Sequence, residues 1–160
     1  MPSNHFDEKG RAVMVDVSGK APTLRTAVAS ALVRMSPETL RQVLEGRSAK
    51  GDVFAVARLA GISAAKKTPE LIPLAHPLAI HAVTIDFTTG PEAGTVRIEG
   101  KVRAHERTGV EMEAMVAVSV AALTVYDMCK GMDRRIAIGD IVLEYKEGGK
   151  SGVFRREERP

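Results

Sequence analysis

The sequence predicts an α+β fold in which a ferredoxin-like antiparallel sheet carries helices on one face, after an N-terminal extension. Residues 83–88 and 95–104 alternate between apolar and polar side chains, and a turn-forming Thr-Gly-Pro-Glu-Ala-Gly segment joins them, which is typical of a β-hairpin. Two helical patterns precede this hairpin, and a helix and a strand follow it. The order ααββαβ becomes a split βαβ arrangement if residues 24–35 form a strand. A chain of this length is most simply a single domain, residues 1–160.

The N-terminal part holds one short pattern and one ambiguous pattern. Residues 12–17 alternate and fit a short strand. In residues 23–35 the apolar side chains recur at helical spacing, but every second residue from Ala27 to Met35 is also apolar, as on one face of a strand. The strand is favoured because it completes the sheet.

Two helices are expected before the hairpin. Residues 36–46 form the first, because Ser36 suits its N-cap, a proline follows in the first turn, and Gly46 suits its end. The second should run from about Asp52, which suits its N-cap, to about residue 65. Its residues are apolar on most faces, which predicts a buried helix.

The C-terminal part is expected to contain a long helix and a strand. The helix covers roughly residues 110–129 and is almost wholly apolar, and the strand lies in residues 141–145. Residues 146–160 are rich in glycine, lysine and arginine, and we expect a flexible tail there.

Composition narrows the classes of function. The net charge of +3 is too small to indicate a nucleic-acid-binding protein, but it allows a local basic pocket for a phosphorylated small molecule. Cys129 is the only cysteine, which excludes a disulfide within the chain and a zinc site built on thiolates. The N-terminus lacks a signal-peptide pattern, and the longest apolar run, residues 114–125, is shorter than the ~20 residues that span a bilayer. We therefore expect a cytoplasmic protein with no membrane or nucleic-acid partner.

Residues 71–78, with the sequence LIPLAHPL, place one histidine between two prolines in an apolar run. Burial alone requires neither His76 nor two residues that lack a backbone donor. Whether the prolines hold His76 toward a ligand depends on whether the rest of the chain supplies charged partners that have no structural purpose of their own. A metal site has little support, because His76 and His81 are five residues apart with no carboxylate or cysteine at ligand spacing between them.

The long helix begins with three residues that carry possible roles. Thr108 and Glu111 have the spacing of a capping box, in which each side chain satisfies a backbone N–H at the helix start. A role for Glu111 at a site is an equal alternative. Glu113 is not explained by capping, although any carboxylate near a helix N-terminus is mildly stabilised.

Asp127 lies near the C-terminal end of the same helix, where the helix dipole disfavours negative charge. Lys130 follows three residues later on the same face and compensates that charge. Two interpretations remain open at this point. The pair is either a local ion pair, or a carboxylate and an ammonium held together for acid–base chemistry.

The spacing along this helix limits how a site can be built. Glu113 and Asp127 are 14 residues apart, or about 21 Å along a helix at ~1.5 Å per residue. Either one of them is structural, or the ligand is long, or two subunits build the site. The nearly all-round apolarity of the helix favours two subunits, because one small sheet covers only one side of it.

Several lysines are candidates for phosphate contacts. Lys50 directly precedes the second helix, whose N-terminal N–H groups form a natural anion site, although a solvated lysine is the simpler alternative. Lys66 ends the same helix, where a cation suits the dipole. The segment "EGGKSG" is not a P-loop, because position 144 is glutamate and no helix-forming run follows. Lys146 and Lys150 remain candidates for a flexible arm over phosphates. Cys129 is expected to be a buried thiol.

Three segments, taken in order, resemble the cyclic pyranopterin monophosphate synthase family (MoaC-type) of molybdenum cofactor biosynthesis. They are "KGDVFAVARLAGISAAKKTPELIPLAHPL", "TGVEMEAMVAVSVAALTVYDMCK" and "GGKSG", and "MVDVSGK" at residues 14–20 matches too. The resemblance implies a pyrophosphate-releasing lyase that converts 3′,8-cyclo-7,8-dihydro-GTP to cyclic pyranopterin monophosphate. It also implies a ferredoxin-like fold and a homohexamer, a trimer of dimers with sites between subunits. No cofactor is implied, except that Mg²⁺ can accompany the triphosphate.

The resemblance also implies roles for the residues that match its motifs. Asp127 and Lys130 correspond to the catalytic pair, and Lys50 to a further catalytic or phosphate-handling lysine. Contacts with the substrate, the last two with its triphosphate, are implied for Leu74, Ala75, His76, Glu111, Met112, Glu113, Lys66 and Lys150. Ala75 departs from the family, which often has cysteine there, but the position keeps a small residue.

Three rival functions remain at this stage. An RNA-binding sheet would stack bases on a pair of aromatic residues, and the hairpin offers only Phe87. A purely structural oligomer would leave Lys50, His76, Asp127 and Lys130 unexplained. A hydrolase acting on GTP itself would turn over GTP, which the family does not predict.

Overall fold

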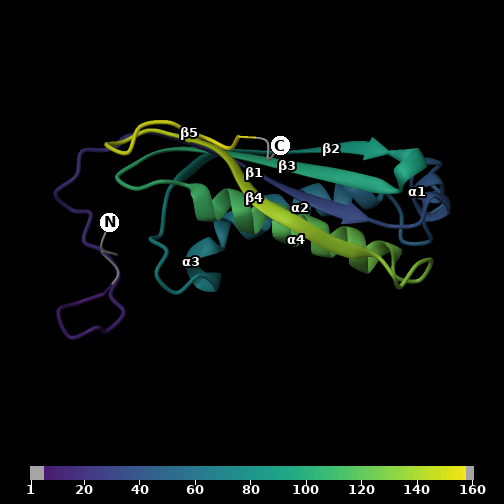
Figure 1. The fold of residues 1–160 in the computed structure, drawn as a ribbon, viewed down its shortest axis with the longest axis horizontal. Helices are drawn as coiled ribbons and strands as arrows, with labels where there is room; N and C mark the ends of the chain where they lie inside the picture. Colours follow the sequence, from purple (N-terminus) through teal and green to yellow (C-terminus); the bar gives the residue numbers. More distant parts are fainter. Residues whose placement is uncertain (1–5, 158–160) are drawn as a thin grey trace.

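The computed structural model describes residues 6–157, which form an α+β fold around a five-stranded antiparallel sheet (Figure 1). The strand order is β2-β3-β1-β4-β5. The elements are β1 (Thr23–Arg34), α1 (Pro37–Leu44), α2 (Val53–Lys66), α3 (Thr68–Leu71), β2 (Ile80–Gly90), a 3₁₀ turn (Pro91–Ala93), β3 (Thr95–Glu106), α4 (Glu111–Cys129), β4 (Ala137–Glu147) and β5 (Phe154–Arg155).

The ambiguous segment 23–35 is a strand, as the topology predicted. β1 lies at the centre of the sheet, antiparallel to β3 on one side and to β4 on the other. Its alternate side chains Ala27, Ala29, Ala31 and Val33 are fully buried against the helices. The strand pattern therefore describes the core face, and small alanines on that face let α4 pack closely on the sheet.

Helices α2 and α4 lie on the same side of the sheet (Figure 1), and they pack against each other as well as against the strands. Asp52 caps α2 as expected, with its carboxylate accepting a hydrogen bond from the Ala55 N–H at 3.0 Å. At Gly61 the two helices are so close that a Cβ atom would lie 2.8 Å from the carbonyl oxygen of Ala117. The composition of α4 would suit a membrane span, but 56% of that stretch is buried inside the fold, as in a core helix.

At the N-terminal end one expectation differs from the structure, and at the C-terminal end the structure adds detail. Residues 12–17 do not form a strand; within the described part of this segment only Ala12 bridges, to Phe6. Among residues 6–157 this segment pairs with no strand of the sheet, and its Val15 carbonyl oxygen lies against His76 instead. In the predicted tail, β4 continues to Glu147, and β5 pairs with Tyr145 and Lys146. The segment between β4 and β5 is therefore a hairpin loop, and the flexibility of residues 146–160 stays a prediction.

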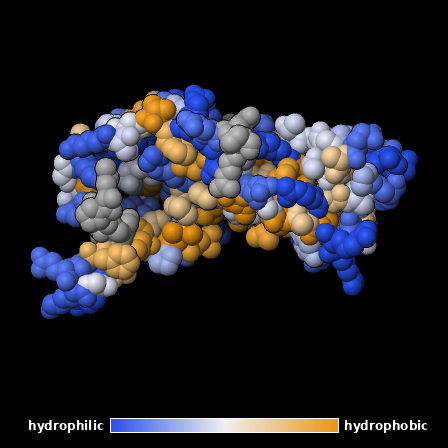
Figure 2. All heavy atoms as spheres, viewed as in Figure 1, coloured by the Kyte–Doolittle hydropathy of each residue, from blue (hydrophilic) through white to orange (hydrophobic). Residues whose placement is uncertain are grey.

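Apolar side chains also gather on the outside of the helical layer (Figure 2). Leu59 on α2 is 67% exposed, and Leu123 on α4 is 58% exposed. Val56 on α2 is exposed as well, and so is Met112 at the start of α4. The sheet covers only one side of α4, so part of the apolar surface of this helix remains exposed.

Candidate functional site

Two cavities meet at the N-terminal end of α4. The first, of about 650 Å³, lies between the loop after β3, the loop after β4 and the segment before β1. We call it the basic cavity. The second, of about 440 Å³, lies against the loop that carries His76, and we call it the His76 cavity. Both are lined by Lys20, Thr108, Gly109 and Glu111, so the two cavities form one continuous cleft.

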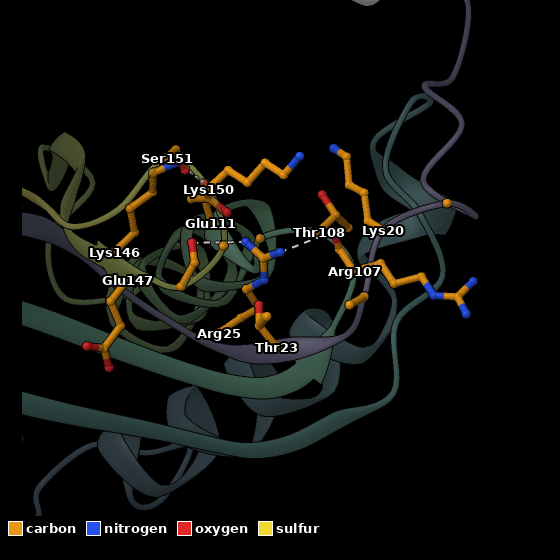
Figure 3. A pocket seen from close by; sticks show the side chains of 15 residues that line it. Lys20, Thr23, Arg25, Arg107, Thr108, Glu111, Lys146, Glu147, Lys150 and Ser151 are labelled. Atoms are coloured by element: carbon orange, nitrogen blue, oxygen red, sulfur yellow. Dashed lines mark hydrogen bonds and ion pairs between the residues drawn. The ribbon is translucent and has the colours of Figure 1, made fainter.

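The basic cavity is positively charged. Its lining contains five cationic side chains and only two carboxylates, those of Glu111 and Glu147. Figure 3 shows Lys20 and Lys150 reaching toward the same region above Arg25. A concave surface with this excess of cations raises the local concentration of polyanions. The cationic residues are Lys20, Arg25, Arg107, Lys146 and Lys150.

Arg25 is the residue that holds the basic cavity together. The residue is 9% exposed. Its guanidinium donates three hydrogen bonds to backbone carbonyl oxygens, those of Glu106 at 3.2 Å, Arg107 at 3.2 Å and Gly148 at 3.0 Å. These bonds tie the end of β3 and the loop after β4 to β1 (Figure 3). Gly149 packs on the guanidinium so closely that a Cβ atom would collide with it.

Sequence reasoning missed Arg25, although a signal was available. Arg25 lies on the core face of β1 with Ala27, Ala29 and Ala31, where a charged side chain is unusual. Buried arginines need acceptors, and a row of small apolar neighbours offers none. An arginine in register with a core face therefore indicates backbone acceptors or an anion nearby.

Glu111 does not take part in a capping box, which corrects the first interpretation of the Thr108–Glu111 spacing. α4 begins at Glu111 with Val110 as its N-cap, and no side chain caps it. The Glu111 carboxylate instead accepts a hydrogen bond from the Lys146 ammonium at 2.7 Å. The carboxylate also lies over Gly109, where a Cβ atom would occupy its place. A cation from β4 has replaced the backbone N–H as its partner.

His76 lies in the second cavity with Leu74, Ala75, Met112 and Glu113, all of them predicted site residues. Its Nε2 lies 2.7 Å from the carbonyl oxygen of Val15. Because a carbonyl oxygen only accepts, Nε2 is the donor in this contact. The contact also places the N-terminal segment along one wall of the His76 cavity.

Glu113 is the most perturbed carboxyl group of the cleft. Its side chain lies on the first turn of α4, and the residue is only 3% exposed. Burial, and to a lesser degree the charge of Glu111, raise the pKa of Glu113 to about 7. A carboxyl group with such a pKa exchanges its proton near neutral pH, as an acid–base group requires.

The three predicted catalytic residues lie together at the opposite end of α4. The Asp127 carboxylate pairs with the ammonium of Lys130 at 2.7 Å and with that of Lys50 at 3.1 Å. Lys50 also donates to the Asp127 carbonyl oxygen at 2.8 Å. Hydrogen bonds from Lys130 and then Lys50 hold the pKa of Asp127 below its usual range, and the same carboxylate raises the pKa of Lys130.

Within one chain, this cluster does not reach the cleft. Asp127 lies 14 residues after Glu113 on the same continuous helix, or about 21 Å at ~1.5 Å per residue. Asp127 and its two lysines are each about half exposed and line neither cavity. Lys66, the remaining predicted contact, is exposed at the end of α2 and also lines neither cavity.

The structure gives two further results on single residues. Cys129 is fully buried, as predicted, and burial raises the pKa of its thiol to about 11. Among residues 6–157, no three histidine, cysteine, aspartate or glutamate side chains gather in a way that could hold a metal ion.

Comparison with known proteins gives one consistent family. Residues 14–149 match the MoaC family model. The chain is 70% identical over 158 residues to the cyclic pyranopterin monophosphate synthase of Geotalea uraniireducens, 68% to that of Geobacter metallireducens and 66% to that of Geobacter sulfurreducens. In each case the match covers 99% of both chains. The chain belongs to the MoaC family.

Proposed function

We propose that this chain converts 3′,8-cyclo-7,8-dihydro-GTP to cyclic pyranopterin monophosphate and releases pyrophosphate, as a lyase of molybdenum cofactor biosynthesis. Full-length identity of up to 70% to synthases of that name supports this function. The observation that carries it in the structure is the continuous cleft. It joins a cavity with five cations to a cavity of mixed polarity, which together suit a nucleoside-like ring system with a triphosphate.

The triphosphate is assigned to the basic cavity. Lys20, Lys146 and Lys150 offer ammonium groups there, and the Arg25 charge is not neutralised by a carboxylate among the described residues. The ring system is assigned to the His76 cavity, where Leu74 and Met112 offer apolar contacts. The size of the two cavities supports this division, since each is large enough for its part of the substrate.

The reaction has two parts, and each part is assigned to one of the two cavities. Rearrangement of the ring requires several proton transfers, for which His76, Glu111 and Glu113 offer acceptors and donors. Closure of the cyclic phosphate is an attack of a substrate hydroxyl on the α-phosphorus, with the bond to pyrophosphate breaking. Cations beside the leaving pyrophosphate stabilise the charge that develops on it. No resident cofactor is needed, and any Mg²⁺ enters with the triphosphate.

Asp127, Lys130 and Lys50 are assigned to the same reaction through assembly of several copies. We assign the chain a homohexamer, a trimer of dimers, in which the Asp127 cluster of one copy faces the cleft of another. The distance along α4 supports this, because one chain cannot bring the two ends together. The exposed apolar surface of α2 and α4, with Leu59 and Leu123, supports contact with a second copy.

The finer classification of the fold follows from the order of the elements. The order β1, α2, β2, β3, α4 and β4 supports a ferredoxin-like fold. Residues 6–22 would then be an N-terminal extension that lines the cleft, and β5 an addition at the sheet edge. Since the substrate derives from GTP, the enzyme is assigned to the cytoplasm.

An RNA-binding role of the sheet is disfavoured by the position of Phe87. Its ring stacks on Phe54 of α2, with 4.8 Å between ring centroids, and Arg58 of α2 lies over it. The aromatic ring therefore belongs to the packing between sheet and helix, and it is not offered to a base.

Pyrophosphate release tests the proposed function. Purified native protein should release pyrophosphate from 3′,8-cyclo-7,8-dihydro-GTP, and it should not turn over GTP. Asp127→Asn and Lys130→Ala should abolish release while the size of the assembly stays unchanged. Well-folded native protein that releases none would refute the function, and release that survives both substitutions would return the Asp127–Lys130 pair to a structural role.

A further inference from the structure

The ion pair between Lys146 and Glu111 lies where the two cavities meet. Glu111 lines both cavities, and Lys146 lines the basic one. Their side chains are 29% and 26% exposed, so each is open to a ligand. Among residues 6–157, Lys146 is the only one of the five cations of the basic cavity that pairs with a carboxylate. The carboxylate of this pair thus borders both cavities, whereas its cation borders the basic cavity.

We infer that the Lys146–Glu111 pair exchanges partners when the substrate binds. The triphosphate takes the Lys146 ammonium, and the released Glu111 carboxylate turns to the ring system in the His76 cavity. Binding of one end of the substrate thereby prepares the group that acts on the other end. This inference rests on the proposed function, because it takes the basic cavity as the triphosphate site.

Electrostatics favour this exchange over an arrangement in which Glu111 and the triphosphate both bind the Lys146 ammonium. A triphosphate carries several negative charges and strong acceptor oxygens, whereas Glu111 offers one charge. Close to Lys146 the carboxylate and the phosphates repel each other, so both cannot keep the same ammonium group at full strength. Lys20, Arg107 and Lys150 also line this cavity, and within the described part of the chain none of them has a carboxylate to give up.

The surroundings of Glu111 allow the movement. It is the first residue of α4, where no earlier turn of helix crowds its side chain. Because Gly109 has no side chain, the Glu111 carboxylate can lie directly over it; a Cβ atom at position 109 would collide with that carboxylate. The only hydrogen bond of the Glu111 side chain within the described residues is the one from Lys146. One rotation therefore suffices to exchange the partner.

The released carboxylate would also meet a suitable neighbour. Glu113 lines the His76 cavity and keeps its proton up to about neutral pH. The charge of Glu111 already contributes to this, and it acts more strongly once Lys146 no longer neutralises it. One carboxyl group of the cavity is then charged and the other neutral, which is the arrangement that separates a base from an acid.

Binding of inorganic tripolyphosphate, measured by titration calorimetry on the full-length protein, tests the exchange. If Glu111 competes with phosphate for Lys146, Glu111→Gln should bind tripolyphosphate about 3- to 10-fold more tightly, the range expected when a partly exposed charged partner no longer has to be displaced. Lys146→Met should weaken binding. In the Lys146→Met background, Glu111→Gln should lose most of its gain.

Glu147→Gln is the matched control, because Glu147 lines the same cavity but its carboxylate is bonded to the Tyr145 hydroxyl at 2.7 Å. Glu147→Gln removes the same charge without freeing Lys146. It should therefore raise the affinity for tripolyphosphate less than Glu111→Gln does, and this smaller gain should persist in the Lys146→Met background. A Glu111→Gln protein with unchanged or weaker affinity, or a gain that survives without Lys146, would overturn the exchange alone. Native protein that binds no tripolyphosphate would overturn the assignment of the basic cavity as well.

Discussion

Replacement of Arg25 tests how the basic cavity is held together. The side chain donates to the carbonyl oxygens of Glu106, Arg107 and Gly148. Arg25→Ala removes all three bonds at once and leaves a space beneath the loop after β4. The loop that carries Lys150 should then lose its fixed position over the basic cavity.

The size of the effect follows from the three hydrogen bonds. Hydrogen bonds to a charged group contribute about 1.5–3 kcal/mol each. Water from the adjoining cavity replaces part of them, so the loss in the free energy of unfolding should be about 2–4 kcal/mol rather than the full sum. Arg25→Lys keeps the charge but not the planar fork, so it should recover no more than about half of that loss.

Two measurements separate this role from a general loss of stability. Chemical denaturation at fixed protein concentration gives the free energy of unfolding, because the proposed assembly would make it depend on protein concentration. Hydrogen exchange of residues 148–153 reports the loop itself. In Arg25→Ala we expect faster exchange there and weaker binding of tripolyphosphate, with exchange in β1 and α4 much less changed. A loss below about 1 kcal/mol with unchanged exchange of the loop would refute the reasoning.

Three further predictions concern single residues. The raised pKa of Glu113, about 7, means that the folded protein holds a proton that the unfolded chain has already released, so stability should fall as pH rises from about 4.5 to 7. Glu113→Gln should remove this dependence of stability on pH and add about 2 kcal/mol to the free energy of unfolding at pH 8. Chemical denaturation at several pH values measures both, and an unchanged dependence on pH would contradict the prediction. Asp127→Asn should leave the free energy of unfolding almost unchanged although it should abolish activity, because the ion pairs of Asp127 are half exposed. A clear loss of stability in the same denaturation experiment would make the cluster structural. Gly61→Ala should cost about 1–3 kcal/mol, because its Cβ would press on the Ala117 carbonyl of α4, and a neutral effect would show that α2 can move.

The fold was largely predictable because its patterns are local or topological. The alternation of the β2–β3 hairpin and the cap at Asp52 are local signals, and both appear as expected. The strand at 23–34 could be chosen over a helix only because it completes the sheet. Residues 12–17 show the limit of this reasoning, since alternation makes a strand only where another strand offers its edge.

The cleft was harder to predict because its contacts join distant parts of the chain. Lys146 meets Glu111 across 35 residues, and that contact depends on the register between β4 and the start of α4. A local capping box looked equally good in the sequence, yet an ammonium from β4 was the stronger partner. In contrast, the separation of Glu113 from Asp127 was predictable, because helix geometry alone fixes it.

Complementation between two inactive variants tests the central claim most directly, namely that each active site takes its parts from two copies of the chain. Asp127→Asn and His76→Asn would be co-expressed with different tags, and the mixed assemblies purified through both tags. Each protein alone should be inactive. If the Asp127 end of one copy serves the cleft of another, random mixing should restore pyrophosphate release at about a quarter of the sites, since half of the chains carry each intact part. Mixed assemblies that remain fully inactive would contradict the account.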